Sequence, residues 1–167
     1  MTIANALLPE FDHEMAVTRT LLERVPDDRG DWKPHAKSMS VSQLALHLAN
    51  LPVWMSIALD KDEFDLNPPG GSSWKSPAFE GSQKLVAWFD GNVATAREAL
   101  ARTTDEGFMQ SWSLKDGGVV RMTMPRIAVV RSFVLSHTIH HRGQLSVFLR
   151  LLDVPVPGIY GPTADTR

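Results

Sequence analysis

The chain has 167 residues, the size of one ordinary domain and enough to enclose a hydrophobic core. Its net charge of −2 gives no bulk basic character that would indicate a nucleic-acid partner. The absence of cysteine excludes disulfides, thiolate zinc sites and a cysteine nucleophile. Residues 1–11 lack a signal-peptide pattern, and Arg131 interrupts the most apolar stretch, so we expect no membrane span. These features predict one domain over residues 1–167 in a soluble, cytoplasmic protein.

The N-terminal part of the chain predicts one long amphipathic helix from about Ala4 to Val25, which Pro26 ends. Apolar residues recur there at intervals of three or four and define an inward face: Leu7, Phe11, Met15, Thr18 and Leu22. His13 points to the opposite side, so we expect it in solvent. The polar residues 27–38 that follow favour a loop.

A second helix is expected to begin at a capping box of Ser40 and Gln43, in which each side chain satisfies the other residue's backbone N–H. Its inward face consists of Leu44, His47, Leu51, Trp54, Met55 and Ala58, so one histidine lies among apolar residues. Pro52 removes a hydrogen bond from this helix, which predicts a kink, with a break at Leu51 as the alternative. Residues 61–81 are rich in proline and glycine and predict a long irregular crossover.

The remaining elements are a third helix, a hairpin and a fourth helix. Residues 82–103 predict the third helix, whose exposed side carries Arg97 and Glu98. Its inward face consists of Leu85, Phe89, Val93, Ala96 and Leu100. Alternating apolar residues around Asp116-Gly117-Gly118 predict a β-hairpin, and Pro125 then starts the last helix, which ends near Leu152. The tail over residues 154–162 is expected to be extended. Four apolar stripes predict an all-α fold, a four-helix bundle.

Three of the six histidines lie in the last helix, within the sequence S-H-T-I-H-H-R-G-Q-L. His137 and His141 are one turn apart on one face, and at about 100° per residue they share an apolar stripe. The other members of that stripe are Val130, Val134, Leu145, Phe148 and Leu152. His140 lies on the flank, and Arg142 points away from the stripe, so we expect Arg142 at the surface. The spacing fits two imidazoles on one metal ion, and two separately bonded core histidines are the alternative.

If the second and fourth helices are neighbours, His47 can join His137 and His141. Three neutral imidazoles with an open position are typical of a catalytic zinc site, and nickel or another divalent ion also accepts imidazole. Gln144 and Asn50 lie near these histidines as candidate outer partners, or as ordinary polar residues at the open end of the bundle. No Asp or Glu on the stripes offers a general base, which argues against hydrolysis without a nucleophile supplied by the metal.

Three segments carry a resemblance to a known family: V-S-Q-L-A-L-H-L-A-N-L-P at 41–52, S-H-T-I-H-H-R-G-Q-L at 136–145 and P-V-P-G-I-Y-G-P at 155–162. Over nearly its whole length the chain resembles the DinB-like (damage-inducible, YfiT-like) superfamily, whose members are regarded as metalloenzymes. The resemblance implies a four-helix bundle in up-down-down-up order. It also implies a divalent metal, zinc or nickel, held by His47, His137 and His141, with His140 near them in an outer role.

The resemblance also implies an activity. Some members of the superfamily are thiol S-transferases that use bacillithiol, mycothiol or glutathione, so we expect a small-molecule substrate and a low-molecular-weight thiol as co-substrate. A metal-dependent hydrolase and a non-catalytic stress-response metal-binding protein are the alternatives. Homodimers are common in the superfamily, so a homodimer is expected, with no nucleic-acid or membrane partner.

Overall fold

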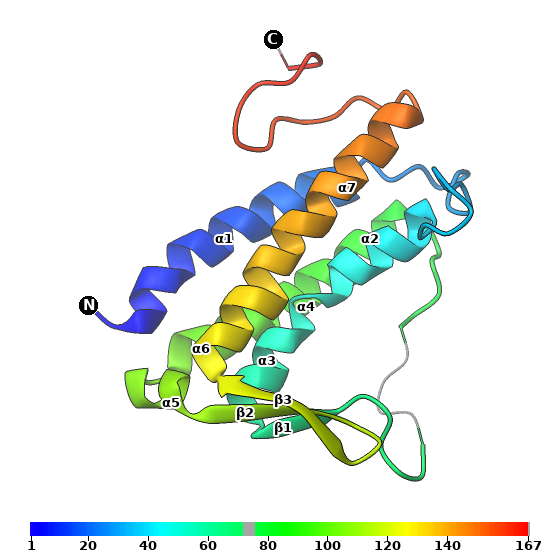
Figure 1. Ribbon diagram of the computed structural model, residues 1–167. Helices are drawn as coiled ribbons and strands as arrows, with labels where there is room; N and C mark the ends of the chain where they lie inside the picture. Colours follow the sequence, from blue (N-terminus) through cyan, green and yellow to red (C-terminus); the bar gives the residue numbers. More distant parts are fainter. Residues whose placement is uncertain (72–75, 167) are drawn as a thin grey trace.

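The structure, a computed structural model, describes residues 1–71 and 76–166 and is mainly helical with one small sheet (Figure 1). None of the helices in these two segments combines the length and the apolar character that a bilayer crossing requires. In chain order the elements are α1 (Ile3–Leu22), α2 (Val41–Asn50), α3 (Val53–Asp60), β1 (Glu63–Asp65), α4 (Ser82–Arg102), α5 (Asp105–Met109), β2 (Ser111–Asp116), β3 (Val119–Pro125), α6 (Arg126–Val129), the π-helix η1 (Val130–Ser136) and α7 (His137–Leu151).

The long helices lie side by side, and the sheet closes one end of the molecule (Figure 1). Helix α1 contacts α4 and α7, and α2 contacts the same two helices. In Figure 1, α1 and α7 run away from the end that carries the sheet, whereas α2–α3 and α4 run toward it. This packing places α2 against α7, the two helices whose histidines the sequence analysis singled out.

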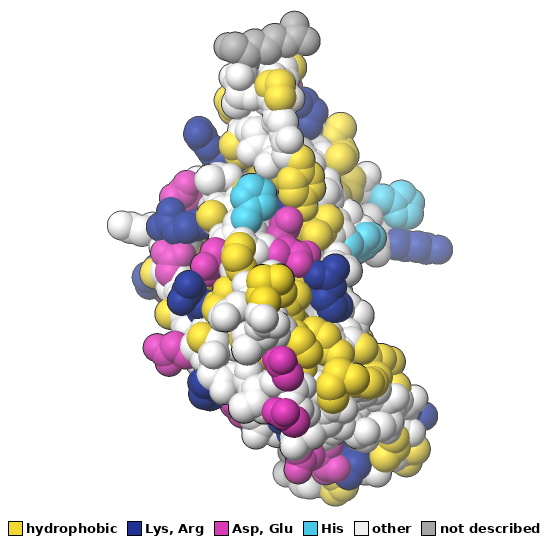
Figure 2. All heavy atoms as spheres, turned by 90° about the vertical axis from the view of Figure 1, so that its left-hand side faces the viewer, with side chains coloured by type: hydrophobic (Ala, Val, Ile, Leu, Met, Phe, Trp, Pro, Cys, Tyr) yellow, Lys and Arg dark blue, Asp and Glu magenta, His cyan; other side chains and the backbone are white. Residues whose placement is uncertain are grey.

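The predicted inward faces of α1 and α4 form much of the core. In α1 all five predicted residues are buried, and in α4 only Val93 is half-buried while the other four are buried. Arg97 and Glu98 are exposed, as predicted. On the face shown in Figure 2, acidic and basic side chains lie interspersed, so no field of one sign marks a docking site for a polyanion there.

The capping box at the start of α2 is confirmed, because Gln43 N donates to Ser40 Oγ and Ser40 N donates to Gln43 Oε1. The predicted kink at Pro52 is wrong, and the alternative break at Leu51 holds: α2 and α3 are separate helices. Leu51 and Pro52 keep right-handed helical angles, with φ of −56° and −59°. Met55 N donates to the carbonyl of Pro52, so the hydrogen bonds tighten where proline lacks its N–H. The apolar face therefore continues across the break.

The crossover after α3 contains a strand that the sequence analysis missed. Strand β1 pairs in parallel with β2, which pairs antiparallel with β3, so the predicted hairpin belongs to a three-stranded sheet. Asp65 joins the two parts, because its carboxylate accepts hydrogen bonds from the backbone N–H groups of Gly117 and Gly118. Both glycines have positive φ, 62° and 79°, which the tight hairpin turn requires. Residues 72–75 of the predicted crossover lie outside the described residues.

The fourth helix begins where it was predicted, with Pro125 preceding α6, but it is not an α-helix throughout. Residues 130–136 form a π-helix, and α7 follows directly at His137. A π-helical turn holds more residues than an α-helical turn, so the rotation of 100° per residue does not hold across η1. The short helix α5, which the sequence analysis also missed, links α4 to the sheet.

Arg142 corrects a prediction, because its side chain is 1 % exposed instead of solvated. It lies on the side of α7 that faces α1, where its guanidinium donates to a carboxylate oxygen of Glu14 at 2.6 Å. Tyr160, from the C-terminal tail, accepts from Arg142 and donates to Glu14 at 2.9 Å. Arg142 and Glu14 are buried, whereas Tyr160 is largely exposed. We call these three residues the buried clasp, after the buried ion pair at its centre. Arg142 does point away from the histidine stripe, but that direction leads to a neighbouring helix.

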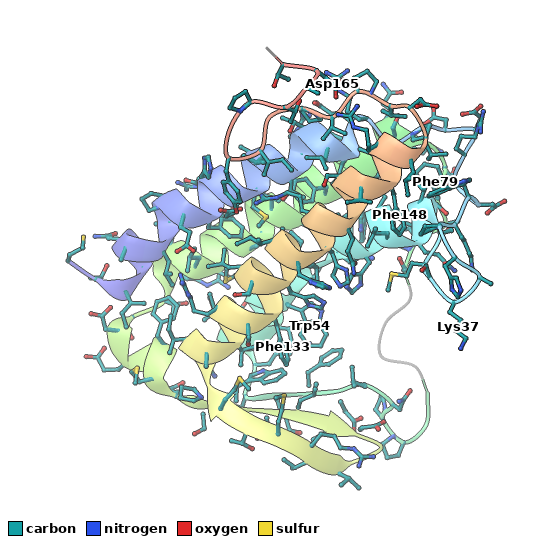
Figure 3. All side chains as sticks on the ribbon, turned by 45° about the horizontal axis from the view of Figure 1, so that its top comes forward. Lys37, Trp54, Phe79, Phe133, Phe148 and Asp165 are labelled. Atoms are coloured by element: carbon teal, nitrogen blue, oxygen red, sulfur yellow. The ribbon has the colours of Figure 1, made fainter. Side chains whose placement is uncertain are left out.

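The C-terminal tail is not helical, as predicted, but it bends at residues 159–161 and so is not extended throughout. Asp165, labelled in Figure 3, forms an ion pair with Arg150 and accepts a hydrogen bond from the Val156 backbone N–H at 2.9 Å. Thr163 donates its hydroxyl to the carbonyl of Val156. These contacts hold the tail in the position from which Tyr160 contacts Arg142 and Glu14.

Candidate metal centre

Three histidines from two helices converge at the contact between α2 and α7. His47 lies in the last turn of α2, His137 is the first residue of α7, and His141 is one turn farther along. His47 Nε2 is 3.3 Å from His137 Nε2, and His137 Nε2 is 2.8 Å from His141 Nε2. All three candidate ligand atoms lie within 4.8 Å of one another. The condition set by the sequence, that the two helices be neighbours, is met.

Gln144 selects the form of one imidazole. Its amide oxygen Oε1 lies 2.7 Å from His141 Nδ1. A carbonyl oxygen only accepts hydrogen bonds, so Nδ1 of His141 carries the proton and Nε2 presents its lone pair. Nε2 is the nitrogen that faces His137 and His47. Gln144, predicted as a candidate outer partner of the histidines, therefore orients a candidate ligand.

The site favours neutral imidazoles. Burial, followed by the proximity of His141 and His137, lowers the pKa of His47 from 6.5 to about 4. Burial is also the main cause that lowers the pKa of His137 and of His141, and His140 adds to both shifts. The hydrogen bond that His141 donates to Gln144 opposes the lowering of the His141 pKa. A metal ion requires deprotonated imidazole, so the fold prepares all three side chains for binding near neutral pH.

These lowered pKa values predict how the stability of the metal-free protein depends on pH. Between about pH 6.5 and pH 4 the unfolded chain binds a proton at His47 that the folded chain does not, so the free energy of unfolding falls as the pH falls through this window. The lowered pKa values of His137 and His141 act in the same direction. The measurement is urea denaturation in the presence of a chelator at several pH values. His47→Gln is the comparison, because removal of the most shifted group makes the dependence shallower; an equal slope in both proteins would contradict the assignment.

The donor set and its spacing fit a divalent ion. Imidazole nitrogens bind zinc at about 2.0–2.1 Å, so two nitrogens on one ion lie no farther apart than roughly 4.2 Å. The two measured separations are within that limit, and the third pair needs at most a small ring rotation. Three imidazoles suit zinc, nickel or copper better than they suit calcium or magnesium, which prefer oxygen ligands.

The other two candidate residues have different surroundings. His140 is exposed, and its ring packs edge-on against His141 with the ring centres 4.8 Å apart. Asn50 is 7 % exposed and links three parts of the fold: its amide donates to Ser76 Oγ at 2.9 Å and accepts from Trp88 Nε1 at 2.7 Å. Asn50 thus holds α2, α4 and the end of the crossover together beside His47.

Two pockets open at His47 and share His47, Asn50 and Trp54. The loop pocket measures about 450 Å³ and is lined in addition by Met39, Gln43, Leu46, Leu51, Ser76 and Pro77. The strand pocket measures about 270 Å³ and is lined in addition by Val53, Ile57, Phe64 and Leu66. His47 therefore borders two neighbouring pockets that share Trp54 and Asn50 as lining residues.

Trp54 is the main residue of the site whose role the sequence analysis missed, because its inward position was taken as ordinary core packing. Its ring makes edge-to-face contacts with Phe64 and Phe133, with ring centres 5.3 Å and 5.6 Å apart. Figure 3 shows Trp54 and Phe133 side by side above the sheet. Phe64 belongs to the strand that was not predicted, so no sequence signal connected it with the site.

Comparisons with known proteins identify the family and the fold. A family model described as DinB family matches residues 1–166. The uncharacterized protein YrdA from Bacillus subtilis (strain 168) is 48 % identical over 33 residues, and this match spans only 20 % of each of the two proteins. The structure of the DinB-like protein YjoA from Bacillus subtilis has a TM-score of 0.69 at 18 % identity and covers 97 % of this chain and 99 % of that chain.

A second solved structure, a DinB-like protein from Bacillus cereus ATCC 10987, has a TM-score of 0.73 at 22 % identity. It covers 95 % of this chain and 98 % of that one. At these identities the two structures establish a likeness of fold alone.

Proposed function

Because the chain belongs to the DinB family, as its motifs predicted, we propose that it is a metal-dependent enzyme that acts on a small molecule. We propose zinc or nickel as the ion, His47, His137 and His141 as its ligands, and transfer of a low-molecular-weight thiol as the reaction. The observation that carries the proposal is the convergence of three imidazole nitrogens within 4.8 Å beside two pockets.

The proposed ligand set leaves one side of the site for a substrate. When bound there, a divalent ion supplies a position at which a thiol loses its proton, which makes the sulfur a nucleophile near neutral pH. In the transfer, the sulfur forms a bond to an electrophilic carbon, the bond to the leaving group breaks with its electron pair, and the thiol proton passes to solvent. The chain's own residues bind and orient the two reactants. Trp54 and Asn50 contribute to this because they line both pockets.

The transferase proposal is favoured over a hydrolase by the residues that surround the histidines. No Asp or Glu lines either pocket among the described residues, so the chain offers no carboxylate general base to activate water. A purely structural metal is the other alternative. It predicts a fourth protein ligand, and the group of candidate ligands found among the described residues has three members.

The test of the proposed reaction measures thiol-dependent loss of an electrophile such as chlorodinitrobenzene, with bacillithiol, mycothiol or glutathione as the thiol. We expect turnover with at least one thiol that disappears on chelation and in His47→Ala, and that persists in His13→Ala. Turnover that survives His47→Ala would overturn the proposal. A protein that binds metal and consumes neither thiol nor electrophile, but unfolds at a much lower temperature on chelation, would support the structural role.

Gln144 is expected to influence metal affinity without being a ligand. Replacement by alanine removes the acceptor that holds His141 Nδ1 protonated, so the ring is free to rotate or to adopt the other tautomer. Loss of such an outer partner typically costs roughly 10–100-fold in metal affinity. Competition with a chromophoric chelator measures the affinity. Gln144→Glu is the companion variant, because it keeps an acceptor oxygen and should retain most of the affinity, and equal affinity of Gln144→Ala and the unaltered protein would contradict this role.

We also propose the up-down-down-up order of a four-helix bundle and assembly as a homodimer. The first is supported by the contacts of α1 and α2 with both α4 and α7 and by the helix directions in Figure 1. The second is supported by family membership alone. Light scattering coupled to size-exclusion chromatography measures the assembly, and a mass of one chain would overturn it.

A further inference from the structure

We propose that the strand pocket is the binding site for the electrophilic substrate and that it selects an uncharged, apolar and flat group. This inference rests on the proposed transferase function and names the substrate class of that site. A transferase needs two reactants to meet at one sulfur, and two pockets meet at His47. The lining of each pocket decides which of the two reactants it suits.

Five of the seven described residues that line the strand pocket are apolar, and the other two are His47 and Asn50. Val53 and Ile57 are one turn apart on α3, and Phe64 and Leu66 lie two residues apart along β1 and its extension. The backbone N–H of Leu66 donates to the carbonyl of Lys115, so the strand geometry continues to that residue. Because side chains alternate along a strand, Phe64 and Leu66 face the same side.

The carboxylate of Asp65, the charged group nearest in sequence to the lining residues, points away from the strand pocket. Asp65 lies between Phe64 and Leu66, and alternation sends its side chain to the opposite side of the strand. There its carboxylate is engaged by the backbone N–H groups of Gly117, Gly118 and Asn67. None of the described residues that line the strand pocket is charged, so in the metal-free protein an ionic group placed in it would lose hydration without gaining an oppositely charged side chain.

The wall shared with the loop pocket favours a flat group. Trp54 is fixed edge-to-face against Phe64 and Phe133, and Trp112 lies 6.3 Å away from Trp54, ring centre to ring centre. Such a cluster holds the indole in one orientation, which gives the pocket a rigid aromatic surface. An aromatic or otherwise planar substrate packs on it with little ordering cost.

The loop pocket suits the more polar reactant. It is larger, about 450 Å³ against about 270 Å³, and its lining includes Gln43 and Ser76, which the strand pocket lacks. The side-chain oxygen of Gln43 accepts from Ser40 N, so its amide N–H groups face outward as donors. A thiol that carries amide or sugar groups finds hydrogen-bond partners there. The two reactants then meet at His47, which lines both pockets.

The test compares two probes that share one ring system, uncharged naphthalenemethanol and anionic naphthalenesulfonate. Equilibrium dialysis against each probe is carried out on the full chain with a chelator present, so that binding does not depend on metal. We expect the uncharged probe to bind at least about tenfold more tightly than the sulfonate. Equal affinity would overturn the selection against charge.

A matched pair of variants assigns the pocket. Ile57→Trp fills the strand pocket and Leu46→Trp fills the loop pocket, and both positions are half-buried on helices. We expect Ile57→Trp to abolish binding of naphthalenemethanol and Leu46→Trp to retain it, with circular dichroism confirming that both variants fold. Retention in Ile57→Trp, or loss in both variants, would overturn the assignment.

Metal content, measured on the same preparations without chelator, separates the two levels of the proposal. Stoichiometric metal without probe binding would overturn this inference and leave the proposed function standing. The expected probe pattern in a protein that binds no metal would overturn the proposed function and confirm an apolar binding site in the strand pocket.

Discussion

The His137→Ala variant should bind almost no metal. The unaltered protein, purified in the same way without chelator or nickel resin, should hold about one equivalent. His137 is the central member of the cluster, because its Nε2 lies 3.3 Å from that of His47 and 2.8 Å from that of His141. Its removal leaves two imidazoles on different helices. Elemental analysis of the two proteins, purified side by side, gives the metal content.

The matched control for this experiment is His140→Ala. His140 neighbours the cluster in sequence and packs against the ring of His141, but it is exposed and is not among the three converging ligands. It should keep its metal. If His137→Ala retained a full equivalent, or if His140→Ala lost as much metal as His137→Ala, the assignment of the ligands would be wrong.

Arg142→Met should be the most destabilising single change outside the apolar core, at about 3–5 kcal/mol in the free energy of unfolding. The variant leaves Glu14, which is 6 % exposed, with a carboxylate whose ionic partner is gone. Tyr160 keeps its hydrogen bond to Glu14, but one hydroxyl cannot compensate a buried charge. Chemical denaturation at neutral pH measures the loss.

Two comparisons test whether burial is the cause. Arg131→Met breaks an ion pair with Glu10 whose side chains are 52 % and 38 % exposed, so it should cost less than about 1 kcal/mol. Glu14→Leu combined with Arg142→Met removes both buried charges and should recover part of the loss. Similar effects of Arg131→Met and Arg142→Met, or a double variant less stable than Arg142→Met, would refute the explanation.

The three converging histidines were predictable because periodicity carries the information. His137 and His141 are separated by four residues within α7, and His47 lies on the apolar face of α2, so the rotation of an α-helix identifies the side that each shares with the core. The helical fold class followed in the same way from the apolar stripes. Family resemblance and helix geometry selected the same three residues.

The failures share a different cause, because periodicity describes one element and not its surroundings. Arg142 was placed correctly relative to the histidine stripe, but the sequence does not say that α1 covers that side of α7 and presents Glu14 there. Strand β1 has three residues and depends on pairing with β2, some fifty residues later, so no local pattern reveals it. The π-helix η1 is likewise set by packing and has no simple sequence signature.

The buried clasp has a consequence for the order in which the protein is made. The hydroxyl of Tyr160 meets Glu14 across 146 residues of chain, and Arg142 meets it across 128. Helix α1 therefore leaves the ribosome long before either partner of its buried carboxylate has been synthesised. Until then Glu14 must remain hydrated, so α1 cannot dock in its final position against the growing bundle. Completion of the core is thus a late event in biosynthesis, and the C-terminal tail takes part in it.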